Sequence, residues 1–178
     1  QRTTLDYLAL AFPVGKMGFG FGIVPYSSVG YRIQSVDQGT TFPTSQYSGK
    51  GGLNRVFLGA SYKLVEGLSF GVEGNYNFGD VETRNIIQNS GVQYGTREVN
   101  SSNLTGFGLN AGLMYDRKVG KKHRFSASAT YSPEGIIKSD NERTLATVLL
   151  FSNGNISTVE ERTLQVDDTE VKLPSKFS

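Results

Sequence analysis

The chain has 178 residues, with 18 Lys and Arg against 16 Asp and Glu, one His, and neither Cys nor Trp. A formal charge of +2 without a basic face gives no reason to expect nucleic-acid binding. The absence of Cys excludes disulfides, thiolate zinc sites and cysteine nucleophiles. No stretch approaches the roughly 18 consecutive apolar residues that predict a transmembrane helix. Glycine is the outlier, with 22 residues, about 12 % of the chain against a usual 7 % or so.

The first predicted elements are two strands near the start of the chain. Leu8, Leu10 and Phe12 alternate with smaller residues, and the segment 13–16 then turns the chain. In the second strand, residues 17–24, apolar side chains alternate with glycine. A period of two is typical of a strand that separates an apolar from a polar environment.

Two further hairpins follow the same pattern. Residues 58–64 and 68–78 alternate apolar with polar or small residues, and a short turn at 65–67 joins them. Residues 106–115 and 124–131 do so as well, joined by 116–122. The sequence therefore predicts six strands in three hairpins over about 4–134.

The connections between these hairpins are predicted to be long. Segments 27–54 and 80–103 are polar and exceed the roughly 12–15 residues beyond which structureless loops are uncommon in compact domains. Short and long connections alternate in transmembrane β-barrels, with short periplasmic turns at one rim and long extracellular loops at the other. Aromatic residues near the strand ends agree with this pattern. They are Tyr26, Tyr62, Tyr76, Phe78, Tyr115 and Tyr131.

The last third of the chain predicts one more hairpin. The apolar run 145–151 is followed by a turn signal at 152–155 containing Asn153-Gly154, and a polar strand resumes at 156–166. In a barrel this would be an extracellular hairpin over about 141–166. Pro174 suits the first residue of a strand, so we expect a further strand to begin near the end of the chain.

Catalytic, metal-binding and cofactor-binding constellations are not evident. The single His, His123, lies in a predicted turn among three cations and indicates a solvated residue. The acidic pairs Glu160-Glu161 and Asp167-Asp168 are read as solvated loop residues, with a weak Ca²⁺ or lipopolysaccharide-bridging site as the alternative. We therefore expect no enzyme activity, no cofactor and no metal.

The lumen-facing side of the predicted strands is the best candidate for a binding site. Lys63 or Arg124 would hold a carboxylate headgroup by a charge-assisted hydrogen bond, and apolar residues would accept the tail. The alternative is that these residues line a wet interior and hydrogen-bond one another or a plug. The candidate positions are Phe57, Ser61, Lys63, Glu73, Asn75, Asn77, Asn110, Met114 and Arg124.

The sequence also resembles the FadL-type outer-membrane transporter family in the order and spacing of several segments. These segments are Phe19–Tyr26, Gly51–Asn54, Phe57–Leu64, Gly67–Gly71, Ala129–Glu134 and Lys172–Ser175. The resemblance implies a fourteen-stranded barrel of a Gram-negative outer membrane that takes up long-chain fatty acids or other hydrophobic compounds. It also implies an N-terminal plug and a sideways exit for the ligand.

This chain departs from that family in extent, because it has no plug segment before Gln1 and holds about half of the strands. We therefore expect residues 1–178 to be one segment of a larger barrel, in contact with membrane lipid and lipopolysaccharide. Two alternatives to transport are a FadL-like barrel that acts as a scaffold or protein partner in an outer-membrane assembly, and a soluble β-sandwich adhesin.

Overall fold

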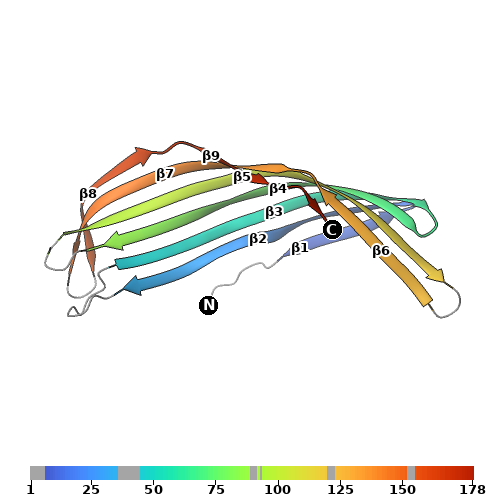
Figure 1. Ribbon diagram of the computed structural model, residues 1–178, viewed down its shortest axis with the longest axis horizontal. Helices are drawn as coiled ribbons and strands as arrows, with labels where there is room; N and C mark the ends of the chain where they lie inside the picture. Colours follow the sequence, from blue (N-terminus) through green and yellow to red (C-terminus); the bar gives the residue numbers. More distant parts are fainter. Residues whose placement is uncertain (1–6, 36–44, 89–91, 93, 120–122, 152–154) are drawn as a thin grey trace.

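The computed structural model describes residues 7–35, 45–88, 92, 94–119, 123–151 and 155–178. In this part of the chain all regular structure is β-strand, and neighbouring strands pair antiparallel in one sheet (Figure 1). No helix that could cross a membrane occurs among the described residues. The fold is therefore all-β and antiparallel, as the sequence predicts.

The sheet contains ten strands. They are β1 (Leu8–Val14), β2 (Met17–Ser35), β3 (Ser45–Val65), β4 (Leu68–Ile87), β5 (Tyr94–Val119), β6 (His123–Ser132), β7 (Gly135–Leu150), β8 (Ile156–Gln165), β9 (Thr169–Leu173) and β10 (Lys176–Phe177).

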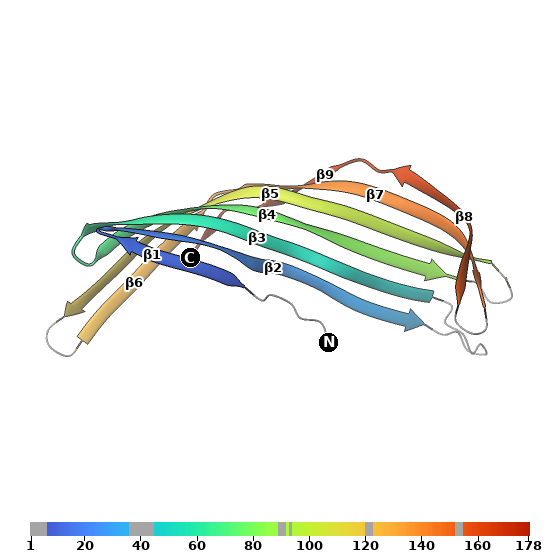
Figure 2. The ribbon, with the colours of Figure 1, turned by 180° about the vertical axis from the view of Figure 1, so that it is seen from behind.

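These strands make seven successive passes in a meander. β1 to β5 each make one pass, and each pairs with the next. β6 and β7 together form the sixth pass, because β5 pairs β6 over 111–119 and β7 over 94–107. β8, β9 and β10 form the seventh pass, pairing in turn with β7, β7 and β6. Figure 2 shows the same curved sheet from behind.

The strands are much longer than the sequence predicts, and this corrects the two long connections. Most of the predicted loop 27–54 belongs to β2 and β3, and most of 80–103 belongs to β4 and β5. Of these two predicted loops, only 36–44 and 88–93 remain as connections between strands. The sequence reading failed because these segments are polar on both sides, whereas Ser, Thr, Tyr and Val within them are compatible with a ladder.

At the other end of the strands the turns are short, as predicted. Two residues join β1 to β2 and two join β3 to β4. In the second turn Gly67 has a φ of +89°, a conformation that residues with a Cβ rarely adopt. The predicted turn at Asn153-Gly154, between β7 and β8, lies outside the described residues.

An apolar band crosses one side of the sheet in five rows. Directly opposite residues of paired strands share a side, so the register places every row on the same side. We call this side of the sheet the band side and the other the reverse side. The rows are Val65–Leu68–Tyr115–Ala127, Val14–Met17–Tyr62–Phe70–Leu113–Ala129, Phe12–Phe19–Ala60–Val72–Ala111–Tyr131, Leu10–Phe21–Leu58–Gly74–Leu109 and Leu8–Ile23–Val56–Tyr76–Phe107–Ile136.

Many side chains of this band are exposed rather than packed. Leu58, Leu109 and Phe107 are 66 %, 65 % and 77 % exposed, although all three are large and apolar. A contiguous exposed apolar surface of this kind marks contact with a protein or a membrane. The reverse side differs, because it carries mainly glycine, alanine and polar residues at the same heights.

The ends of β4 and β7 that lie far from the short turns form a small buried core. Ile86, Ala146 and Val148 are buried on the band side, and Val148 is fully buried. The Arg97 Nη2 and Glu161 Oε2 atoms, 2.7 Å apart, form an ion pair between β5 and β8. Ala146 lies between these two residues in the register, so the ion pair covers this core.

Replacing Val148 by Ala tests whether this core holds the β7–β8 end in place. We expect Val148→Ala to lower the free energy of unfolding by about 1–2 kcal/mol, since it removes fully buried methyl groups. Urea unfolding followed by circular dichroism measures the change. Val159→Ala is the matched control, because Val159 of β8 is 54 % exposed. Equal losses in both variants would contradict the packing described here.

Candidate functional site

A hydrogen-bonded polar cluster occupies the reverse side behind the upper rows of the band. Arg55 of β3 donates from Nε to Asn77 Oδ1 at 2.8 Å, and Asn77 Nδ2 donates to Asn75 Oδ1 at 3.3 Å. The Arg55 guanidinium carbon also lies 4.0 Å from the centroid of the Tyr26 ring. Asn77 is only 2 % exposed and Arg55 is half-buried, so the cluster buries amide groups beside a partly covered guanidinium.

A second group of polar residues adjoins the first along the same strands. Asn110 Nδ2 donates to Glu73 Oε1 at 2.8 Å, and the Ser132 hydroxyl donates to Asn110 Oδ1 at 2.7 Å. Three successive passes thus contribute to one chain of hydrogen bonds. Half-buried polar groups that are paired in this way avoid the cost of desolvation without a partner.

Close approach of the backbone makes room for this cluster. Gly108 lies opposite Asn75 in the register, and a Cβ at Gly108 would meet Asn75 Oδ1 at 2.6 Å. Only glycine fits there without displacing an amide of the cluster. The glycine at position 108 of β5 therefore follows from the space that the Asn75 side chain of β4 needs.

A hollow of about 440 Å³ opens beside the cluster, where the sixth and seventh passes are interrupted. Pro133-Glu134 separates β6 from β7, and Pro174-Ser175 separates β9 from β10 directly across from it. Three residues of β5, 108–110, lie across from four residues of the sixth pass, 132–135. The sixth pass therefore carries one extra residue here, which is a β-bulge. The hollow is lined by Arg55, Asn77, Asn110, Ser132 and, across it, Lys176.

The register places all nine predicted site residues on the reverse side. Glu73, Asn75, Asn77 and Asn110 come together in the cluster. Phe57 lies directly opposite Asn75 of the cluster and, on its other side, opposite Gly22. The Ser61 hydroxyl donates to the Gly18 carbonyl at 3.3 Å. Lys63, Met114 and Arg124 lie nearer the short turns and are not part of the cluster.

Arg124 pairs within the protein rather than standing alone. Its guanidinium donates to both carboxylate oxygens of Asp116, from Nε at 2.6 Å in one case, and the Ser126 hydroxyl donates to the same carboxylate at 3.1 Å. Asp116 follows Tyr115, the last residue of β5 whose side chain lies on the band side level with the band. The hydrogen bonds from Arg124 hold the pKa of Asp116 below its ordinary 3.8, although partial desolvation opposes them and Ser126 adds to them.

Four residues that take part in these interactions were not predicted as site residues from the sequence: Tyr26, Arg55, Asp116 and Ser132. Tyr26 is the extra residue of a bulge between Pro25 and Ser27, which cannot be recognised from alternation. Arg55 lies between the predicted loop 27–54 and the predicted strand 58–64. Its alternation with Val56 was the available signal, because it puts Arg55 on the polar side.

The two acidic pairs do not form a metal site in the part of the chain that the structure describes. Glu161 is the partner of Arg97. Asp168 Oδ1 accepts a hydrogen bond from the Asn141 backbone at 3.4 Å, and the Asp167 carbonyl accepts one from the Asn141 amide at 3.2 Å.

The fold and these two sides define an all-β antiparallel protein with one apolar and one polar surface. The chain belongs to the BamG family, whose family model matches residues 1–178. This family is associated with the BAM complex, so the chain has a role related to outer-membrane assembly. Family and fold together point to the envelope of a Gram-negative bacterium. Comparison with curated proteins and with solved structures gives no match.

The resemblance to FadL-type transporters is therefore wrong as a family assignment, since the matching family is BamG. The segments that suggested it consist of apolar residues alternating with glycine or serine, next to short turns. Any strand between an apolar and a polar environment carries that pattern, so it cannot separate one family of barrels from another.

The Asp116–Arg124 pair predicts a specific titration. We expect the Asp116 carboxyl to titrate below pH 3.8, and Arg124→Gln to raise its pKa toward that value. Because the pKa of Asp116 is lower in the folded protein than in the unfolded chain, the Asp116–Arg124 pair stabilises the fold at pH values above the unfolded-state pKa. This contribution is lost as the pH falls through the folded-state pKa. Carbon-13 NMR of labelled aspartate measures both titrations.

Lys118→Gln is the matched control for this experiment. Lys118 lies opposite Arg124 in the register and carries the same charge, but it makes no hydrogen bond to Asp116 among the described residues. If Lys118→Gln raised the pKa of Asp116 as much as Arg124→Gln, a general charge effect would replace the hydrogen bonds as the cause.

Proposed function

We propose that this chain forms part of the wall of an outer-membrane β-barrel and that the protein acts as a structural partner in outer-membrane protein assembly. The apolar band carries the proposal. It spans nine residues on β4, from Leu68 to Tyr76, and nine on β5, from Phe107 to Tyr115. Transmembrane strands need about 9–11 residues when they tilt by about 45°.

The edges of the sheet support a larger barrel. β1 lies at one edge and the β8–β10 pass at the other, and the described parts of these two strands do not pair with each other. Unpaired backbone groups are untenable in the hydrocarbon region, so further strands must cover both edges. The strand count implied by the FadL resemblance forms no part of this proposal.

The polar cluster favours a structural role over a ligand path. Its amides and carboxylate already hydrogen-bond Arg55, Ser132 and one another, so these groups have partners within the protein without a small polar ligand. Arg55 has no carboxylate partner among the described residues, but Asn77 and the Tyr26 ring contact it on two sides. Membership of the BamG family then supports assembly, rather than uptake of hydrophobic compounds, as the role of this wall.

Fractionation of the full-length native protein tests this proposal. We expect the tagged protein in the outer-membrane fraction, with faster gel mobility when unheated than when boiled, because a closed barrel resists detergent unfolding. We also expect the BAM complex to co-purify with it after mild detergent extraction.

An outer-membrane porin carrying the same tag is the control for adventitious co-purification. A soluble protein with unchanged mobility would overturn the membrane assignment and favour the β-sandwich adhesin. A heat-modifiable barrel that never co-purifies with the BAM complex would overturn the assembly role alone.

A further inference from the structure

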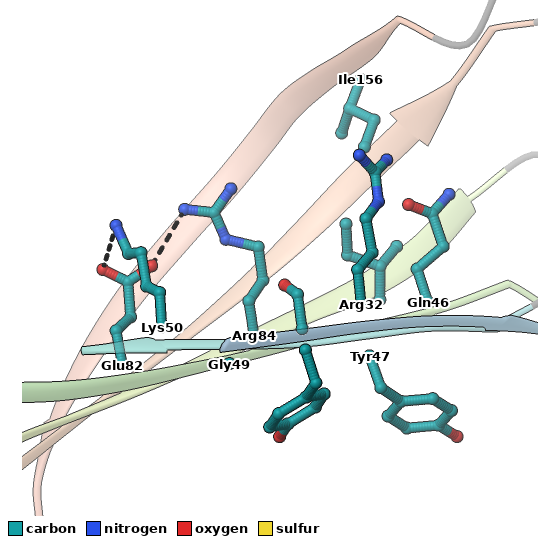
Figure 3. A pocket seen from close by; sticks show the side chains of 11 residues that line it. Arg32, Gln46, Tyr47, Gly49, Lys50, Glu82, Arg84 and Ile156 are labelled. Atoms are coloured by element: carbon teal, nitrogen blue, oxygen red, sulfur yellow. Dashed lines mark hydrogen bonds and ion pairs between the residues drawn. The ribbon is translucent and has the colours of Figure 1, made fainter. Parts of the chain in front are cut away.

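A second hollow lies on the band side, well beyond the apolar band. It has a volume of about 530 Å³ and is bounded by the ends of β2, β3 and β4 and by the start of β8. Figure 3 shows Arg32, Gln46, Lys50 and Arg84 on the same side of the sheet, with Ile156 beyond Arg32, while Tyr47 points the opposite way. The hollow is thus a groove between the sheet and the overlying β7–β8 end.

Positive charge predominates in this groove. Arg32, Lys50 and Arg84 lie on three neighbouring strands, and Glu82 is the one acidic residue in the lining. Glu82 serves two cations at once, with Lys50 Nζ at 3.1 Å and Arg84 Nη2 at 3.3 Å from its oxygens. Arg32 forms no ion pair or hydrogen bond with another described side chain. Three cations and one anion leave the groove with a net charge of +2.

The register brings these cations to adjacent heights. Arg32 lies opposite Ser48, which in turn lies opposite Arg84, and Lys50 and Glu82 form the next row toward the band. Gln46 adds an amide donor one row further out, opposite Ile86. The groove therefore presents guanidinium, ammonium and amide donors together, the groups that bind phosphate by charge-assisted hydrogen bonds.

Height above the band identifies the kind of anion. Lys50 lies six residues beyond Val56 on β3, and Arg84 lies eight beyond Tyr76 on β4. At about 3.3 Å per residue and a tilt near 45°, the cations lie about 14–19 Å above the top row of the band. The phospholipid headgroup layer extends only about 5–8 Å beyond the hydrocarbon. Lipopolysaccharide carries anionic groups further out, on its inner-core sugars.

We propose that this groove binds the phosphate groups of the lipopolysaccharide inner core. The inference rests on the proposed function, because it requires the apolar band to lie in the outer membrane. In barrels the rim away from the short turns faces the cell exterior, which is where lipopolysaccharide is found. The anion binds over β2 and β3, since the carboxylates of Asp80, Asp140 and Glu142 lie on the same side toward β7.

Binding of purified lipopolysaccharide to the full-length protein in detergent tests the proposal. We expect the triple variant Arg32→Gln/Lys50→Gln/Arg84→Gln to bind on the order of tenfold more weakly, because it removes the charge-assisted donors. We expect Glu82→Gln to bind more tightly, because it frees Lys50 and Arg84 from their shared partner. This gain cannot be produced by misfolding.

The control variant is Lys16→Gln/Arg117→Gln/Lys118→Gln, which removes the same charge from the short-turn rim. We expect it to bind like the wild type. Dephosphorylated lipopolysaccharide is expected to bind weakly to every variant. Displacement by millimolar inorganic phosphate would show an unspecific anion site and overturn the assignment to lipopolysaccharide.

Unchanged binding in both the triple variant and Glu82→Gln would also overturn the proposal. That outcome leaves the membrane location untouched if the protein still fractionates with the outer membrane. Conversely, a soluble full-length protein removes the proposed function, and the groove inference with it, whatever the binding result. An acidic protein segment that competes with lipopolysaccharide for the same cations would point to a protein partner instead.

Discussion

The register of the antiparallel ladder is the constraint on which the rest of this structure depends. Opposite residues share a side, so pairing such as Leu58 with Gly74, and Gly74 with Leu109, carries one apolar row across successive passes. A slip of one residue would move a whole strand's apolar set to the other side. The bulge at Tyr26 makes such a shift once, within β2, and it does so just beyond the top row of the band. Band, polar cluster and basic groove all take their places from this register.

The two sides of the sheet differ in polarity and in how their side chains are paired. On the band side, large apolar side chains such as Phe107 are exposed, and beyond the band the same side becomes charged. On the reverse side, Asn77 is nearly inaccessible and its amide is used within the fold. This arrangement suits a wall that is apolar where it meets lipid, internally satisfied on its polar side, and charged where it leaves the hydrocarbon. We propose that such a wall serves as a platform for the assembly role to which the family points.

Much of this could be predicted from the sequence where alternation is strong. The apolar residues of β4, such as Phe70 and Val72, and the candidate residues Asn75 and Asn77 lie on the sides that the period of two assigns to them. Prediction failed where both sides of a strand are polar, as in the upper parts of β3 and β4, because no contrast marks the pairing there. It also failed for Arg55 and Asp116, whose partners Asn77 and Arg124 are distant in sequence or lie across a turn. The family could not be read from strand patterns that many barrels share.

Lipid exposure of the apolar band is the central claim, and neighbouring residues of β5 test it most directly. Leu113 and Met114 are 47 % and 50 % exposed but lie on opposite sides of the sheet. The described chain lacks cysteine, so single cysteines at these positions can carry spin labels in protein reconstituted into bilayers. We expect the label at 113 to be accessible to oxygen and shielded from a polar relaxation agent, and the label at 114 to show the reverse. Equal accessibility of both labels to the polar agent would contradict a lipid-facing band.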